Sequence, residues 1–382
     1  MVFVAFNLVI PFLPLFIQEL GVHDRAQVTA LAGIQQTASS IGLAMFSPVW
    51  GLLGDRFGRK AMFLRAVSFG ALVTGATALV GNITQLLVLR FFMGALTGVQ
   101  GPAMALITSL APRSRTAYAI GLIQMAVYSG TFAGPLIGGV VAASFGYRTA
   151  FISGAVLMAI AALAIFTQVH EEFAPPPPRD AKGSYLRDLR ELVAGSHMLP
   201  LLVTIFFITF ALFCIPPMMP LFVQNLPNLP GAAPTVTGIV LGTAGLCSAI
   251  SAPLLGRLGP RIGYERILTV AALSAALAVG SIPLIWSVAP LVIVEVVLGF
   301  AAGGLMPMAF TLAALRTPVE RRGSIYGLTS STSASGVAVG PFAAGLLGAA
   351  AGVRPVFLLP AAVFLFVAGL SVLNRKSAPR SR

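Results

Sequence analysis

Charged residues are scarce in this sequence. They make up 9% of the 382 residues, whereas about a quarter of an average soluble domain is charged. Hydrophobic residues make up 57%, which is more apolar surface than a water-soluble fold can bury. The sequence also lacks the strict alternation of apolar and polar residues that marks the strands of membrane barrels. Successive apolar runs of about 20 residues predict instead an all-α membrane protein with many spans.

Cysteine and histidine are also rare, with two and three residues respectively. Cys214 and Cys247 lie in apolar runs and are interpreted as small packing residues, while His23, His170 and His197 lack the spacing of a zinc site. We therefore expect no disulfide framework and no metal site. A phosphate-binding loop and a convergent set of Ser, His and Asp are missing too, so we expect neither direct use of ATP nor an enzyme.

The apolar runs predict twelve membrane spans, with errors of a few residues at each end. These spans are 2–20, 27–49, 61–80, 84–109, 117–143, 149–167, 198–223, 235–255, 266–286, 289–315, 324–350 and 354–373. Between the sixth and seventh, four prolines at 175–178 precede a charged segment at 185–192 that is typical of a short amphipathic helix on the membrane surface. The predicted organisation is an N-terminal six-helix half (1–167), a linker (168–197), a C-terminal six-helix half (198–374) and a short basic tail (375–382).

The net charge of +13 is distributed unevenly between the joints. All but four of the 24 Lys and Arg residues fall in alternate joints, the exceptions being Arg25, Arg148, Arg354 and the intraspan Arg90. This bias places the basic joints, the linker and the C-terminal tail in the cytoplasm. A nucleic-acid partner is not expected, because the basic residues do not cluster with aromatic residues on one face.

The two predicted halves repeat each other. Residues 11–18 recur as 217–224, and Gly134-Pro135 recurs as Gly340-Pro341, both at an offset of 206. Six spans per repeat is an even number, so the copies enter the membrane with the same polarity, related by an axis along the membrane normal. The start of span seven has its counterpart before Met1, so span one is short. We expect the true start codon to lie upstream, the alternative being a truncated product.

A charged, glycine-rich loop joins spans two and three. Its notable residues are Gly51, Leu53, Asp55, Arg56, Gly58, Arg59, Lys60 and Leu64. Glycines permit a tight turn and close helix approach, and Asp55 can accept bonds from amides at a neighbouring helix N-terminus. A weaker copy at 256–263 has Pro260 at the position of Asp55. We interpret the first loop as a conformational latch, meaning a contact that holds one transport state. The alternative is a basic loop that only fixes orientation.

Span five carries glycines at helical spacing. Gly130, Gly134 and Gly138 recur every four residues and form a smooth stripe for close packing, followed by Gly139. Pro135 leaves a backbone carbonyl free and bends the helix. Tight packing alone also explains this pattern.

Together these motifs resemble those of the major facilitator superfamily, over nearly the whole chain. The loop at 51–64 is similar to the superfamily's loop motif between spans two and three, and 90–94 to its fourth-span motif, although Met93 stands where the family often has Gln. Residues 130–139 resemble the fifth-span motif of proton-driven antiporters, particularly twelve-span bacterial drug exporters. The resemblance implies a major facilitator fold of 12 transmembrane helices in two pseudo-symmetric six-helix bundles. It also implies that Asp55 reaches the start of span eleven near Ser324, and that the span-five bend seals against span eight.

Charges within spans are the sharpest candidates for function, because each costs about 2.5–3.5 kcal/mol on insertion scales. Arg90 and Glu295 are equivalent in the repeat, and each lies roughly 10 Å below the outer boundary at 1.5 Å per residue. Glu295 is the first candidate for proton coupling, since desolvation disfavours its anion; the alternative is a structural role. Glu19, at the outer end of span one, is the second candidate. Family exporters often have a carboxylate deep in span one, and 1–18 has none.

Polar or adaptable residues in the apolar spans are candidates for lining a substrate cavity. They are Asn7, Gln35, Gln36, Gln124, Met125, Tyr128, Met218, Met306, Phe310, Tyr326 and Ser330. The leading hypothesis is a proton-coupled exporter of lipophilic or cationic compounds in a bacterial inner membrane, acting as a monomer and using the proton gradient without a cofactor. Its expected partners are a small-molecule substrate, protons and the lipid bilayer. The alternatives are an exporter of one defined metabolite, such as a sugar or amino-acid derivative, and a non-transporting membrane sensor or scaffold.

Overall fold

The computed structural model describes residues 1–110, 116–171, 198–227, 232–316 and 322–377, and every regular element in these ranges is a helix. Before residue 172 these are α1 (Val2–Val9), η1 (Ile10–Phe12), α2 (Leu13–Glu19), α3 (Arg25–Phe57), α4 (Arg59–Thr77), α5 (Ile83–Thr97), α6 (Gln100–Leu110), α7 (Thr116–Phe145) and α8 (Tyr147–Gln168). After residue 197 they are α10 (Leu199–Cys214), α11 (Met219–Gln224), α12 (Ala233–Ile262), α13 (Tyr264–Ser281), η3 (Ile282–Leu284), α14 (Val288–Leu315), α15 (Arg322–Ala351), α16 (Val353–Val356) and α17 (Leu358–Ser377). The predicted surface helix at 185–192 lies outside the described residues.

Ten helical segments of the described chain are long and apolar enough to cross a membrane. Helices α3 and α4 occupy the places of predicted spans two and three but are not among the ten. Amides and hydroxyls such as Gln35, Gln36 and Thr37 dilute the apolar character of α3, and Lys60 and Arg65 that of α4. Large apolar side chains exposed on other helices, including Leu163 at 63% and Leu277 at 75%, suit a lipid environment.

Several predicted spans are interrupted. Span one divides at Pro11 and Pro14, and span seven divides at their repeat equivalents Pro217 and Pro220, because proline has no N–H for the helical bond. The span predicted over 84–109 corresponds to the candidate membrane segment Ile83–Met104, within which the helix is broken, since α5 ends before Gly98 and α6 begins at Gln100.

The repeat is visible in the turns between long helices. Gly58 and Gly263 have φ of 92° and 97° between spans two and three and between spans eight and nine. Gly146 and Gly352 have φ of 83° and 88° before α8 and α16. Only glycine adopts this conformation without strain, so the repeated glycines encode repeated corners.

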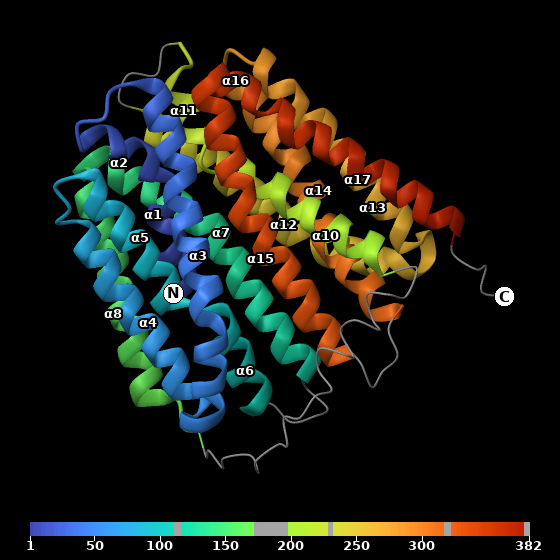
Figure 1. Ribbon diagram of the computed structural model, residues 1–382, viewed down its shortest axis with the longest axis horizontal. Helices are drawn as coiled ribbons and strands as arrows, with labels where there is room; N and C mark the ends of the chain where they lie inside the picture. Colours follow the sequence, from blue (N-terminus) through green and yellow to red (C-terminus); the bar gives the residue numbers. More distant parts are fainter. Residues whose placement is uncertain (111–115, 172–197, 228–231, 317–321, 378–382) are drawn as a thin grey trace.

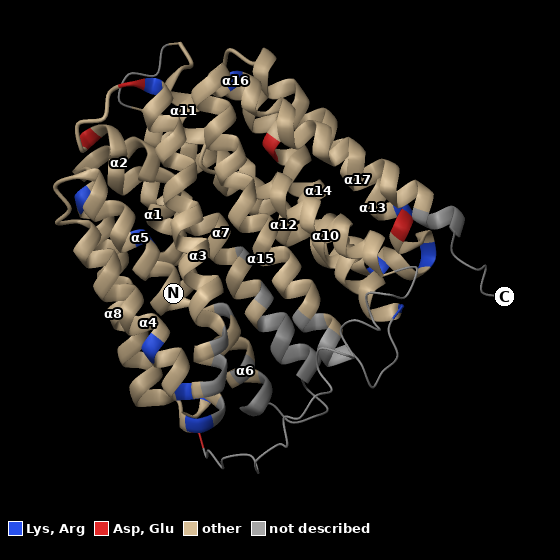
Figure 2. Cartoon of the chain, in the orientation of Figure 1, with Lys and Arg blue, Asp and Glu red and all other residues tan. Residues whose placement is uncertain are grey.

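Two groups of helices lie side by side, one from each side of the 172–197 segment (Figure 1). Helices α7 and α3 of the first group lie against α12 and α15 of the second. We call the end with Gln18 and Gln224 the Gln18 end, and the opposite end, where Arg56, Lys60 and Arg261 lie, the basic end. Figure 2 shows the basic residues of that end in two separate places, one on each group.

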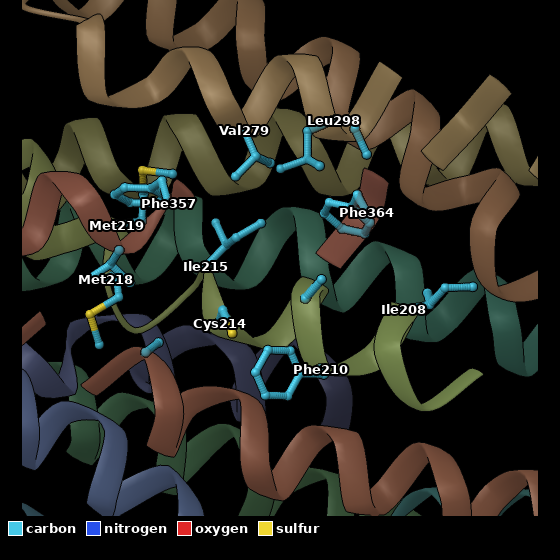
Figure 3. Packing of buried hydrophobic residues seen from close by; sticks show 14 of the residues in the cluster. Ile208, Phe210, Cys214, Ile215, Met218, Met219, Val279, Leu298, Phe357 and Phe364 are labelled. Atoms are coloured by element: carbon cyan, nitrogen blue, oxygen red, sulfur yellow. The ribbon is translucent and has the colours of Figure 1, made fainter. Parts of the chain in front are cut away.

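The second group packs around a continuous apolar core. Buried side chains from α10, α11, α13, α14 and α17 meet there (Figure 3). Cys214 is 1% exposed and its thiol donates to the Gly340 carbonyl at 3.2 Å. Cys247 is also buried and free, so both cysteines are packing residues, as predicted.

Candidate functional site

The two helix groups contact each other along two helix pairs, α7–α12 and α3–α15, which we call seams. Glycines allow the paired helices of each seam to approach closely. In the α7–α12 seam, a β-carbon on Gly139 would lie 2.5 Å from the Pro234 carbonyl oxygen, and one on Gly238 would collide with the Pro135 carbonyl. On the same α12 face, a β-carbon on Gly245 would lie 2.9 Å from the Phe132 nitrogen. Side chains at these positions would therefore separate the helices.

The α3–α15 seam is the repeat equivalent of the first. A β-carbon on Gly345 would lie 3.0 Å from the Gly33 α-carbon, and one on Gly33 would collide with the Pro341 carbonyl. The Thr37 hydroxyl donates to the Ala338 carbonyl across this seam at 2.9 Å. The offsets of 206 between Pro135 and Pro341 and between Gly139 and Gly345 show that one sequence device closes both seams.

The predicted glycine stripe of span five packs against α1 rather than in the α7–α12 seam. Gly134 and Gly138 lie against Asn7 and Leu8 of α1, within the same helix group, and Gly130 lies against Phe3. The neighbouring face, with Pro135 and Gly139, is the one that contacts span eight. Span five is thus packed between α1 and α12.

The contacts described for both seams lie in the part of each helix nearer the Gln18 end. They involve residues 29–37 and 338–348 in one seam, and 131–139 and 234–245 in the other. Towards the basic end, polar side chains on the same helices are exposed, namely those of Ser47, Ser129, Ser330 and Ser331. The seam contacts among the described residues thus lie nearer the Gln18 end, while these serines of α3, α7 and α15 are exposed further along the same helices.

Arg90 and Glu295 are buried at equivalent places in the two groups. Their exposed fractions are 4% and 1%, and neither Arg90 Nε nor Glu295 Oε1 has a hydrogen-bond partner in the described structure. One turn further along, Gly94 of α5 lies against Ser39 of α3, and Gly299 of α14 lies against Ala244 of α12. Each charge is thus held inside its own group, and no hydrogen bond between described atoms joins the two.

The second carboxylate candidate has a different environment. Glu19 is exposed at the last residue of α2, at the Gln18 end. A proton on this carboxyl exchanges freely with solvent, whereas one on Glu295 is shielded. Glu295 is the more deeply buried of the two, at 1% exposure, so its surroundings disfavour its anion more strongly than those of Glu19 do.

The charged loop makes a contact that its sequence pattern does not reveal. The Glu171 carboxylate, just after α8, accepts from the backbone N–H of Arg59 at 3.1 Å and of Lys60 at 2.7 Å. The Lys60 ammonium donates to the Phe166 carbonyl at 2.9 Å. A carboxylate at the first N–H groups of α4 compensates their lack of helical partners. The only sequence signal was an acid directly after span six.

The remaining loop residues are placed only in part. Gly58 makes the turn, and Arg56 and Arg59 are exposed. The side chains of Gly51, Asp55 and Ser324 lie outside the described residues, so the predicted contact of Asp55 with span eleven stays a prediction. Helix α15 is nevertheless the partner of α3 in the seam.

Four of the predicted cavity residues are half-buried, and the side chains of three others are not described. Asn7 is half-buried and its amide donates to the Phe3 carbonyl at 2.9 Å. Gln36, Met306 and Phe310 are half-buried, the last two packed on the main core. The side chains of Gln124, Tyr128 and Tyr326 lie outside the described residues.

Arginines clamp the Gln18 end of each group. Arg148 donates from its two terminal nitrogens to the Ala78 and Val80 carbonyls at 2.7 and 2.9 Å. Its equivalent Arg354 donates to the Pro283 and Ile285 carbonyls at 2.7 and 3.2 Å. The clamps tie the first turn of spans six and twelve to the ends of spans three and nine.

These clamps also contact aromatic rings of the interrupted spans. The guanidinium carbon of Arg148 lies 5.8 Å from the Phe16 ring centroid, and that of Arg354 lies 5.4 Å from the Phe222 ring. Between the two groups, the side-chain amides of Gln18 and Gln224 donate to each other, both at 2.9 Å. The sequence identifies the two glutamines as the last residues of the repeated stretch 11–18 and 217–224, but it does not reveal that they contact each other.

Comparison with known proteins gives one consistent result. The family profile of the Major Facilitator Superfamily matches residues 1–294 and 230–382. The multidrug resistance protein MdtG of Salmonella dublin is 33% identical over 366 residues, which cover 95% of this chain and 89% of that protein. MdtG of Salmonella arizonae is similar to the same extent.

Solved structures resemble the fold at low sequence identity. A bacterial homologue of the human lysosomal transporter Spinster, in an inward-facing and occupied conformation, has a TM-score of 0.80 at 16% identity and covers 99% of this chain and 94% of that one. The nucleoside transporter NupG has a TM-score of 0.79 at 14% identity, with 98% and 97% covered. These structures confirm the predicted helical architecture.

Proposed function

Because the chain belongs to the Major Facilitator Superfamily, a family of integral multi-pass membrane transporters of small molecules, we propose that it is a proton-coupled exporter of lipophilic or cationic compounds. The observation that carries the proposal is the 33% identity to a multidrug resistance protein along 95% of the chain. Transport proceeds by alternating access, as the two helix groups rock about their seams. It needs neither a cofactor nor a second copy of the chain, and involves no enzymatic step.

The proposed orientation follows from the charges. Alternate joints hold nearly all Lys and Arg residues, so the basic end faces the cytoplasm of a bacterial inner membrane. The Gln18 end then faces outwards. In this orientation, the contacts of both seams near the Gln18 end support the proposal of an inward-facing state, in which a substrate enters from the cytoplasm or the inner leaflet.

Glu295 is the proposed proton site. Its carboxyl is 1% exposed, and Oε1 has no hydrogen-bond partner among the described atoms. A neutral carboxyl is tolerated in such surroundings far better than an anion. It lies seven residues after the start of α14, roughly 10 Å from the outer boundary. Proton entry from the outer side would therefore neutralise Glu295, and proton release to the cytoplasm would follow in the inward-open state.

The test uses the full chain in proteoliposomes with an imposed pH gradient and a fluorescent lipophilic cation. We expect gradient-driven transport by the unaltered protein. Glu295→Gln should abolish the response to the gradient while keeping substrate exchange at equal pH, and Glu19→Gln should behave like the unaltered protein. Gradient-driven transport by Glu295→Gln would refute its role, and its loss in Glu19→Gln alone would move that role to Glu19.

Substrate breadth needs a separate measurement. In an efflux-deficient host, the proposal expects raised resistance to several chemically unrelated lipophilic or cationic compounds. Resistance to a single compound would support export of one defined metabolite instead. Absence of transport for every compound, together with stable insertion, would favour a sensor or scaffold.

A further inference from the structure

The contact between Gln18 and Gln224 has a special geometry. Each side-chain Nε2 donates to the other residue's Oε1 at 2.9 Å, so the pair is reciprocal. The two residues are separated by 206 positions, which is the offset of the internal repeat. Residues that are equivalent under a twofold axis touch each other only on that axis. The amide pair therefore marks the pseudo-twofold axis at the Gln18 end.

Both glutamines are held at fixed places. Gln18 follows by two residues the buried Phe16, whose ring contacts Arg148, and Gln224 follows Phe222, whose ring contacts Arg354. The arginines in turn bind backbone carbonyls at the ends of spans three and nine. Each amide is thus presented by a clamped element of its own helix group, so its position reports the position of the whole group at this end.

We propose that the Gln18–Gln224 pair is the positioning contact that holds the Gln18 end closed on the axis and sets how often that end opens. The inference concerns the balance of conformations, so it depends neither on the transported compound nor on proton coupling.

The chemistry of the pair suits a contact that must break in every cycle. Glutamine has both a donor and an acceptor, so either amide satisfies the other without any charge. The pair is exposed, and each amide is hydrated once the pair separates, so opening leaves no buried polar group unpaired. The pair therefore biases the equilibrium only modestly, by about tenfold for two exposed hydrogen bonds.

Because the two hydrogen bonds are reciprocal, the inference predicts a specific pattern of effects in the alanine variants. Because each residue takes part in both bonds, Gln18→Ala and Gln224→Ala each remove the entire contact. The two variants should have equal effects, and the double variant should add nothing further. In a double-mutant cycle, the coupling should equal the effect of either single variant in size.

The substitution Thr29→Cys, at a buried position of the neighbouring α3–α15 seam, provides the readout. Thr29 is 1% exposed and faces Gly348 across the α3–α15 seam. In the full chain carrying Cys214→Ala and Cys247→Ala, Thr29→Cys is labelled in proteoliposomes by a maleimide that does not cross the membrane, applied from the Gln18 side. Labelling measures the opening of that end directly, without a substrate.

We expect both single alanine variants and the double variant to raise the labelling rate about tenfold and equally. Gln27→Ala is the matched control, since Gln27 is an exposed glutamine at the same end whose backbone N–H donates to Asp24. It should leave the rate unchanged. The combination of Gln18→Glu with Gln224→Lys rebuilds a contact and should return the rate to that of the unaltered pair or below.

Three results would overturn the inference: unchanged labelling in all alanine variants, additive effects of the two single variants, or no rescue by the Glu and Lys combination. Rescue also separates the inference from simple misfolding, because a misfolded chain is not restored by a second substitution on the far side of the axis. If the unaltered protein transports no compound while the variants show the expected labelling pattern, the proposed function fails and this inference stands.

Discussion

The closeness of the α7–α12 seam makes Gly139→Ala a demanding test of how the transporter closes. The added carbon would lie 2.5 Å from the Pro234 carbonyl oxygen and 3.2 Å from the Thr235 α-carbon. Close carbon–oxygen contacts begin at about 3.3 Å, so the backbones must separate by about 0.8 Å. Both atoms belong to backbone, which cannot turn away as a flexible side chain would.

Overpacking of this kind costs about 1–3 kcal/mol. The cost applies to the state in which α7 and α12 touch near the Gln18 end, and it is relieved when that end opens. The variant should therefore shift the balance away from the closed state by a factor of about 5–150. We expect slower gradient-driven transport and a lower thermal unfolding midpoint of the purified protein.

Gly256→Ala is the matched control, because Gly256 lies on α12 and nothing lies within 4 Å of an added β-carbon. It makes the same chemical change on the same helix pair. Transport rate and unfolding midpoint are measured for both variants in parallel. Equal behaviour of Gly139→Ala and Gly256→Ala would show that seam closeness does not govern the conformational balance, and would refute the reasoning.

Three further predictions concern the ends of the helices. Glu171→Ala should lower the stability by about 1 kcal/mol, because the first N–H groups of α4 lose their acceptor, and thermal unfolding measures it. Arg148→Lys and Arg354→Lys should each lower the stability by about 1–2 kcal/mol, and to a similar extent, since an ammonium on a shorter, flexible side chain cannot reproduce the contact with two carbonyls, which Arg148 makes through both terminal nitrogens and Arg354 through Nη1 alone. Asp55→Asn should impair transport while membrane insertion is kept, whereas Pro260→Ala should be mild.

The contradicting outcomes differ between these predictions. Unchanged stability in Glu171→Ala would show that water replaces the carboxylate at the α4 terminus at no cost. A large effect at only one of the two arginines would contradict the equivalence of the clamps. Equal loss of transport in Asp55→Asn and Pro260→Ala would support two loops that only fix orientation, rather than one latch.

The glycine corners rest on local backbone chemistry and are readable from the sequence, whereas the breaks near Pro11 and Pro217 lie within spans that were predicted without interruption. Pro11 and Pro217 stand where a helix is interrupted, but Pro135, Pro307 and Pro341 lie inside long helices, so proline alone does not decide a break. Glycine at 58 and at 263 permits a positive φ at a turn. The repeat offset of about 206 residues predicts the equivalent positions in the second half from those in the first. The break at Gly98 was missed because a glycine in an apolar run is compatible with a continuous helix.

The candidate site was less accessible, because spacing along one helix does not reveal the partner of each face. The glycines of span five predicted close packing, but not that Gly134 meets α1 while Gly139 meets α12. Similarly, burial of Glu295 was expected from its place in an apolar run, whereas the missing partner of its Oε1 depends on the neighbouring helices.

Sequence alone determined that this protein is a helical membrane protein built from two equivalent parts, because hydrophobicity and repetition are properties of the chain itself. It also determined the family, through residues that stand close together along the chain. Only the tertiary structure decided which equivalent residues meet. In the sequence, Gln18 and Gln224 are only the last residues of a repeated stretch; their contact depends on how the two halves are placed about a common axis, which is a property of their arrangement in space.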